Sequence, residues 1–284
     1  MCNNSKVAVI FTCFNRKEKT IRCIKSILEQ TNMPPFDLYV CDDGSTDGTS
    51  AAIRQLIPEA FIVQGNGNLF WSKGMHAAMI IAVEARYDYY LMVNDDVDFF
   101  PTMWKCMFAP YDEGKTKVAV VGSTKSRCSG TATYGGRKLI YDKSKYYESP
   151  VISPNSNEYM ECDVANWNCF LMDKYIQLEV GLIDPRFAHG LGDYDYSLRI
   201  RETKHKILIA KEYIGYCENN TKKHTYMDSS LPRIERLRLI SKANGFPVKA
   251  WILYVGKHYK KAKFRNMFSP LIKDYLKILV GKDI

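Results

Sequence analysis

The sequence has no apolar run long enough to cross a membrane, which would take about 20 residues in a helix. Residues 1–6 are polar, and the apolar run 7–11 that follows is too short for the core of a signal peptide. These two absences argue against an integral membrane protein and a secreted one. We therefore expect a cytoplasmic protein.

Paired cysteines are missing too. The chain has nine cysteines, an odd number, and none of them forms a CxxC motif. This pattern argues against a disulfide framework and against a structural zinc site. It favours the reducing environment of the cytoplasm.

Negative charge is scarce near the C-terminus. Residues 229–284 hold thirteen Lys and Arg against three acidic residues, so this segment alone exceeds the +9 net charge of the whole chain. Such a basic segment predicts an anionic partner. We expect this segment to bind peripherally to an anionic surface on the inner face of the membrane. Trp251, Tyr254 and Phe264 are the residues expected to contact the lipid. The alternative is a basic helical cap on the fold. Nucleic acid is not expected, because the aromatic residues form no stacking platform.

The first hundred residues alternate between short apolar runs and helical spacing. Strands are predicted over 6–13, 36–41, 60–64 and 89–93, and helices over 18–30, 49–56 and 74–85. This order predicts an α/β fold with a Rossmann-like, mostly parallel sheet flanked by helices. We expect one such domain over residues 1–228 and a helical extension over 229–284, broken near 245–247 and 269–270. Residues 123–157 are expected to form a hairpin and loops over the site.

Acidic residues follow the central strand directly. Asn94, Asp95 and Asp96 end the apolar run of residues 89–93. Neighbouring carboxylates repel one another and are costly to desolvate, and a divalent cation removes that cost. Mg²⁺ or Mn²⁺ suits one or two carboxylates together with substrate phosphates. The alternative is an exposed acidic turn.

Polar residues also follow the three earlier strands, at the sheet edge where a nucleotide lies in open α/β folds. Arg16 is a candidate phosphate or base contact, or an ordinary surface arginine. For Asp42 and Asp43 there are two possibilities: they bind a nucleoside, or they close a local turn. The glycine-containing loop before residue 74 is not GxGxxG, so it does not indicate a dinucleotide. The candidate nucleotide-binding residues are Thr12, Asn15, Arg16, Asp42, Asp43, Asn66 and Lys73 on these loops, together with Asn94 and Asp95 after the central strand.

A second acidic pair, Asp193 and Asp195, lies in a glycine-containing loop before a predicted helix. A general base must reach the acceptor hydroxyl, and we assign this role to Asp193. The alternative is a helix N-cap. His224 is a candidate further metal ligand or a surface histidine. The candidate acceptor-binding residues are Asn166, Trp167 and Tyr194. For the two aromatic residues the alternative is packing in the core.

Together these motifs resemble the family 2 glycosyltransferases with the GT-A fold, especially rhamnosyltransferase-like enzymes of bacterial surface-polysaccharide assembly. The matching pieces, within residues 6–220, are CFNR (13–16), DDGSTDG (42–48), GNGNLFWSKGM (65–75), NDD (94–96) and HGLGDYDYSLR (189–199). The resemblance implies that Asp42 and Asp43 bind the nucleoside and that residues 94–96 occupy the DXD position. It also implies that Asp96 is the principal metal ligand and Asp193 the catalytic base.

The chain departs from the family pattern in three places. Asn94 replaces the first aspartate of DXD, Gly192 replaces the glutamate that often precedes the base, and the QxxRW motif of processive synthases is absent. The first departure predicts a modest metal affinity, and the absence of QxxRW predicts transfer of a single sugar.

The resemblance implies an inverting, metal-dependent hexosyl- or deoxyhexosyltransferase. Its donor would be a UDP- or dTDP-sugar, and its acceptor a hydroxyl of a glycan or lipid-linked molecule in polysaccharide synthesis. Two alternatives remain, a nucleotidyltransferase and a catalytically silent subunit that binds a nucleotide sugar.

Overall fold

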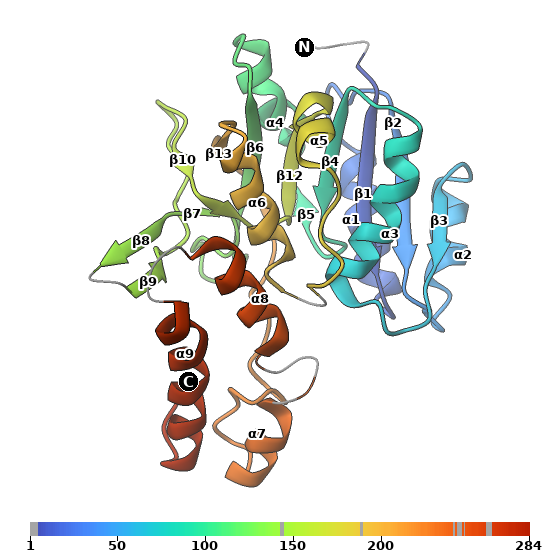
Figure 1. Cartoon of the computed structure of the whole chain (residues 1–284). Helices are drawn as coiled ribbons and strands as arrows, with labels where there is room; N and C mark the ends of the chain where they lie inside the picture. The colour runs from blue at the N-terminus through green and yellow to red at the C-terminus, as the bar shows by residue number, and fades with distance from the viewer. Residues whose placement is uncertain are drawn as a thin grey trace.

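The computed structural model describes residues 5–142, 145–187, 190–240, 242, 246, 248–259 and 263–284, and Figure 1 shows their arrangement. In this described part a nine-stranded sheet forms the centre, in the order β10-β13-β6-β12-β4-β1-β2-β3, with β5 beside β13. The strands are β1 (Val7–Cys13), β2 (Phe36–Asp42), β3 (Phe61–Gln64), β4 (Tyr89–Val93), β5 (Asp98–Phe99), β6 (Val118–Lys125), β10 (Glu161–Cys162), β12 (Cys169–Asp173) and β13 (Lys206–Tyr216).

Most strands of the sheet run in one direction. β1 is parallel to β2 and β4, β2 is parallel to β3, and β6 is parallel to β13. β12 lies antiparallel between β4 and β6, so β6 runs the same way as β4. β10 and β5 also run against this direction. The predicted mostly parallel α/β sheet is therefore confirmed.

Helices cover both faces of the sheet, as the alternation of strands and helices predicts. One face packs on α1 (Lys17–Leu28), α2 (Thr49–Leu56) and α4 (Met103–Asp112). The other packs on α3 (Phe70–Glu84), α5 (Lys174–Val180) and α6 (Gly192–Glu202). Residues 7–11 of β1 are fully buried because consecutive side chains enter opposite cores.

The sheet has a switch point between β1 and β4. From β1 the chain moves to β2 and β3 on one side, and then returns to place β4 on the other side. Loops leave these two strands in opposite directions, which opens a crevice at their carboxyl ends. Residues 94–96 follow β4 at this crevice.

A small peripheral layer forms mostly within residues 123–157, the segment predicted to be a hairpin and loops. β8 (Leu139–Asp142) pairs with β9 (Lys145–Glu148), and β7 (Gly136–Arg137) pairs with β11 (Val164–Ala165). The expected hairpin is therefore present, and it ends at Glu148 close to α6.

The C-terminal segment is helical, as predicted, with α7 (Arg233–Ile240), α8 (Val248–His258) and α9 (Lys263–Leu279). Figure 1 shows α7 and α9 beyond the end of the sheet, with α8 between them and α6. Among the described residues, none of the helices combines the length and the continuous apolar surface that a membrane span requires.

One predicted helix break is wrong, because α9 continues through Pro270. Proline has no N–H, so the carbonyl of Asn266, four residues earlier, loses its helical partner. The indole Nε1 of Trp251 donates to that carbonyl oxygen at 3.0 Å. A side chain from α8 thus replaces the missing helical bond. The other predicted break involves Gly245 and Pro247, which lie outside the described residues.

Candidate active site

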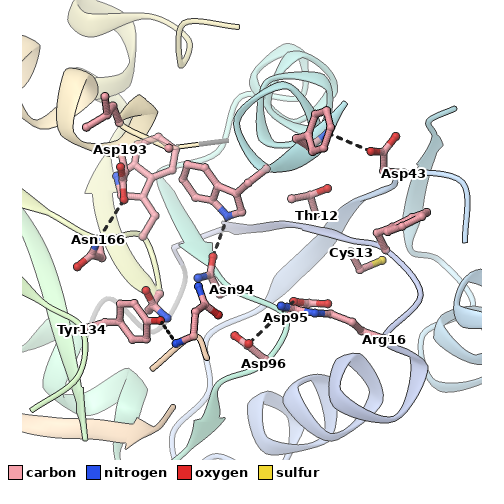
Figure 2. A pocket seen from close by; sticks show the side chains of 18 of the residues that line it. Thr12, Cys13, Arg16, Asp43, Asn94, Asp95, Asp96, Tyr134, Asn166 and Asp193 are labelled. Atoms are coloured by element: carbon pink, nitrogen blue, oxygen red, sulfur yellow. Dashed lines mark hydrogen bonds and ion pairs between the residues drawn. The ribbon is translucent and has the colours of Figure 1, made fainter. Parts of the chain in front are cut away.

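A cavity of about 590 Å³ opens at the carboxyl ends of β1, β2 and β4. Figure 2 shows its walls, with Asp43 and Asp193 on different sides and the residues after β4 between them. Twelve of the residues that line it are Thr12, Cys13, Arg16, Asp43, Trp71, Asn94, Asp95, Asp96, Asn166, Trp167, Asp193 and Tyr194. The fold therefore brings most of the predicted site residues together from distant parts of the sequence.

Asp43 organises one end of the cavity. Its buried carboxylate accepts hydrogen bonds from the backbone N–H groups of Gly67 (2.9 Å), Leu69 (2.9 Å) and Phe70 (3.0 Å). These bonds fix the loop between β3 and α3 against the end of β2. A carboxylate has about four acceptor positions, so one position remains after these three bonds.

Thr12 lies beside this loop at the end of β1. Its hydroxyl donates to the carbonyl oxygen of Cys41 at 2.9 Å. Gly74, in the first turns of α3, approaches it so closely that an added Cβ would lie 2.3 Å from Thr12 Oγ1. A glycine at this helix position therefore lets α3 pack directly on the cavity wall.

Asp42 and Asn15 lie behind the cavity wall. Asp42 accepts from the N–H of Ser45 at 2.9 Å and from the hydroxyl of Ser50. Asn15 Oδ1 accepts from the N–H of Thr46 at 2.8 Å. Both side chains hold the 42–48 loop in shape, and neither lines the cavity. Asp42 therefore closes a local turn, which was the alternative to nucleoside binding in the sequence analysis.

Asn66 and Lys73 are exposed and do not line the cavity. Asn66 Oδ1 accepts from the N–H of Asn68 at 3.1 Å, which closes a local turn. Lys73 lies on the first turn of α3. The structure thus places neither side chain where it contacts a ligand in this cavity.

The residues after β4 have different surroundings. Asn94 Oδ1 accepts from the indole Nε1 of Trp71 at 2.8 Å. Asp95 is 3% exposed and accepts from Arg16 at 2.7 Å and from Thr20 at 3.0 Å. Burial raises the pKa of Asp95 despite the positive charge of Arg16. Asp95 therefore holds α1 and Arg16 against the sheet.

Asp96 presents its carboxylate to the cavity. Its Oδ2 lies 3.3 Å from Arg16 Nη1, and its Oδ1 accepts from the thiol of Cys217 at 3.6 Å. Arg16 thus bridges Asp95 and Asp96 across the edge of the cavity (Figure 2). Its guanidinium already neutralises part of the negative charge at the place predicted for a cation.

The side chains near Asp96 suit a hard divalent cation with a single protein carboxylate. The described residues contain no group of three His, Cys, Asp or Glu side chains that could enclose a metal. Mg²⁺ and Mn²⁺ do not need such a cage, because substrate phosphates and water complete their coordination. His224 is exposed and does not line the cavity. Its backbone N–H donates to the carboxylate of Asp228 at 2.8 Å.

Asp193 forms the opposite wall, on the first turn of α6. Its carboxylate accepts from the N–H of Tyr194 at 2.9 Å and from the amide of Asn166 at 3.3 Å (Figure 2). Burial raises the pKa of Asp193 to about 6, against the lowering effect of those two bonds. A carboxylate with such a pKa is ionised at neutral pH and still basic enough to accept a proton. His189, the first residue of this motif, lies outside the described residues.

The neighbours of Asp193 connect it to the rest of the fold. The hydroxyl of Tyr194 donates to Glu148 at the end of the β8–β9 hairpin at 3.2 Å. Trp167 is 1% exposed and packs edge-on against Trp71 and Tyr196, so most of its ring belongs to the core. The hairpin and the Trp167 ring therefore fix the wall on which Asp193 lies.

Several contributors were not identified from the sequence. Tyr134 and Asn220 line the cavity and are joined by a bond from the Asn220 N–H to the Tyr134 hydroxyl at 3.1 Å. Glu148 was expected only as part of a loop over the site. No local motif marks these residues, because the pairing of β6 with β13 and the position of the β8–β9 hairpin bring them to the site.

The basic C-terminal segment also reaches the site region. Asp195 is fully buried beside Arg199 (2.9 Å), Lys257 (2.5 Å) and His258 (2.8 Å), the last two from α8. Burial alone would raise the pKa of Asp195, but the bonds from His258 and Lys257 and the charge of Arg199 lower it. For α8 this packing is the alternative reading of the basic segment, a helical cap on the fold.

Comparisons with known proteins identify the family of this chain. The sequence pattern of the family described as Glycosyl transferase family 2 matches residues 8–175, more than half of the chain. A search of curated proteins finds no significant match.

Solved structures share the fold at low sequence identity. A crystal structure of GalNAc-T7 with UDP, GalNAc and Mn²⁺ has a TM-score of 0.59 and 12% identity, over 99% of this chain and 57% of that one. The mannosyltransferase PcManGT from Pyrobaculum calidifontis, with GDP-Man and Mn²⁺, has a TM-score of 0.58 and 13% identity, over 99% of this chain and 74% of that one. The chain thus spans little more than half the length of the GalNAc-T7 chain.

Proposed function

Because the chain belongs to glycosyl transferase family 2 and is therefore a glycosyltransferase, we propose that it moves one sugar from a UDP- or dTDP-sugar to an acceptor hydroxyl with inversion. The observation that carries this proposal is the carboxylate of Asp193 in the cavity wall, with a pKa raised to about 6 by burial. Family membership favours this reaction over nucleotidyl transfer and over a silent binding subunit.

We place the nucleoside at the end of the cavity formed by Thr12, Asp43 and the loop before α3. The free acceptor position of Asp43 suits an N–H of a pyrimidine base, and its other positions hold the loop. Asn94 is fixed by the indole of Trp71 and suits a ribose or sugar hydroxyl. Support for a nucleotide-sugar donor also comes from the two similar structures, which contain UDP and GDP-Man.

The diphosphate would lie over Asp96 and Arg16. Asp96 would hold Mg²⁺ or Mn²⁺, which supplies positive charge to the departing diphosphate when bound. Arg16 is held in place by Asp95 at 2.7 Å. It can therefore exchange its longer contact with Asp96 for a contact with a phosphate oxygen while it stays in the site. Both similar structures contain Mn²⁺, which supports this assignment.

Asp193 would remove the proton from the acceptor hydroxyl as that oxygen attacks the anomeric carbon. The amide of Asn166 and the N–H of Tyr194 orient its carboxylate. Asn166, Trp167 and Tyr194 form the adjacent wall and would position a glycan or lipid-linked acceptor of surface-polysaccharide synthesis. Holding both substrates in this geometry would supply much of the rate.

Thermal unfolding with a panel of nucleotide sugars tests the donor proposal. A ligand that binds only the folded protein raises its unfolding temperature with increasing concentration. We expect UDP- or dTDP-sugars to raise it in the presence of Mn²⁺, and slow hydrolysis of the same donor to follow. Equal shifts with nucleoside triphosphates and release of pyrophosphate would instead establish nucleotidyl transfer.

A further inference from the structure

One face of α9 carries a row of exposed apolar side chains. The residues recur at every fourth position, which places successive members beside one another on a helix. Their exposed fractions range from 44% to 82%. We call this row the α9 stripe; its members are Phe264, Phe268, Ile272 and Leu276.

Other residues of α9 already make its contacts with the protein. Ile278 is buried in a small core shared with α7 and Tyr226. Near the other end, the carbonyl oxygen of Asn266 accepts the bond from Trp251 in α8. These contacts fix the rotation of α9 about its axis, so the α9 stripe faces outward.

Basic residues accompany the α9 stripe. Within α9, Lys263, Arg265, Lys273 and Lys277 outnumber the one acidic residue, Asp274. An amphipathic helix with exposed large apolar residues and lysines lies in the headgroup region of a membrane, and anionic lipids strengthen its binding. A protein partner with an apolar groove would not by itself require this excess of positive charge.

We propose that α9 lies in the plane of a membrane that contains anionic lipid, with the α9 stripe inserted between headgroups and acyl chains. This location corrects the expectation that Trp251 and Tyr254 contact the lipid. Tyr254 is 2% exposed and packs in the core between α8 and α6, and Trp251 is bonded to α9. Of the three expected residues only Phe264, which is 82% exposed, belongs to the membrane surface.

The structure also shows how this surface connects to the catalytic site. α8 contacts α9, and its residues Lys257 and His258 pair with Asp195, two residues from Asp193. A membrane-bound α9 would therefore hold the acceptor wall at a fixed distance from the lipid. Membrane binding goes beyond the proposed transfer reaction and can be measured without any sugar donor.

Co-sedimentation of the full chain with lipid vesicles tests this proposal. We expect binding to vesicles of phosphatidylcholine with phosphatidylglycerol and at least about tenfold weaker binding to phosphatidylcholine alone. The double variant Phe264→Ser/Ile272→Ser should lose about tenfold or more in affinity. Lys273→Glu/Lys277→Glu, which keeps the stripe, should lose the preference for phosphatidylglycerol.

The matched control is Tyr175→Ser/Leu178→Ser, which removes two apolar side chains of α5 that are 66% and 74% exposed. It should bind vesicles as the unmodified chain does. All variants should keep the donor-induced rise in unfolding temperature, which separates this proposal from the transfer reaction. Equal binding of the stripe variant and the control would overturn the proposal, as would a dimer in light scattering that the stripe variant abolishes.

Discussion

His258 Nε2 lies 2.8 Å from Asp195 Oδ1, so the C-terminal helix α8 is joined to the helix that carries the candidate base. Asp195 has no solvent exposure, and Lys257 and Arg199 contact the same carboxylate. The basic segment is therefore more than an appended tail, because it contributes the positive charges that a buried acid requires.

Asp195→Asn should lower the free energy of unfolding by about 3 kcal/mol, because it removes the fully buried carboxylate that pairs with Arg199 and Lys257. Urea unfolding at neutral pH measures the loss. Asp88→Asn is the control, since Asp88 pairs with Lys174 where both side chains are more than 40% exposed. That pair should contribute less than about 1 kcal/mol. A similar loss in both variants would contradict the role of Asp195.

The rate of transfer should rise with pH through about 6 and then level off. Burial raises the pKa of Asp193 to about 6 from its ordinary value of 3.8, so the base is protonated and inactive below that range. The pH profile of kcat/KM with saturating cation measures this dependence. Asn166→Ala removes a bond that favours the ionised carboxylate, so it should move the midpoint to higher pH. A rate that is flat between pH 5 and 8 would contradict the assignment.

Asp96→Asn should abolish the part of the donor-induced thermal shift that depends on Mn²⁺. The carboxylate of Asp96 faces the cavity, and an amide binds hard divalent cations much more weakly. Asp98→Asn provides the control, because Asp98 lies two residues further on and pairs with Arg127 outside the cavity. Chelation of the metal should make the unmodified chain behave like Asp96→Asn. An intact Mn²⁺ effect in that variant would exclude Asp96 as the ligand.

Gly74→Ala should destabilise the protein by about 1–3 kcal/mol through overpacking and should weaken donor binding. The new Cβ would lie 2.3 Å from Thr12 Oγ1 and would displace that cavity residue. The same substitution in α8, Gly256→Ala, meets no atom closer than 3.6 Å. It should stabilise its helix by up to about 1 kcal/mol. In urea unfolding, the changes in the free energy of unfolding of the two variants should therefore have opposite signs. A gain in stability for Gly74→Ala would contradict the close approach of α3 to Thr12.

The fold could be predicted because apolar runs and helical spacing are local properties of the sequence. β1 to β4 and the helices between them lie where the alternation places them. The break predicted at Pro270 failed for a non-local reason. The helix continues there because Trp251, nineteen residues earlier, donates a hydrogen bond to the carbonyl oxygen of Asn266.

The site could be predicted only in part, because a motif does not show which of its side chains turns toward the cavity. Asp42 and Asp43 are adjacent, yet only Asp43 lines the cavity while Asp42 holds its own loop. For His224 the sequence left two possibilities, a metal ligand and a surface histidine, and the structure places it on the surface. Tyr134 and Glu148 carry no motif, and only tertiary pairing reveals them.

The most direct measurement of the central claim compares Asp193→Asn with the unmodified chain in donor binding and in transfer. The substitution keeps the size of the side chain and removes the basic oxygen, so transfer should fall by about 10²- to 10⁴-fold. The affinity for the donor in the presence of Mn²⁺, measured by calorimetry, should stay within about twofold, because Asp193 acts on the acceptor and not on the nucleotide. Near-normal transfer by Asp193→Asn, with donor binding intact, would show that another group is the base.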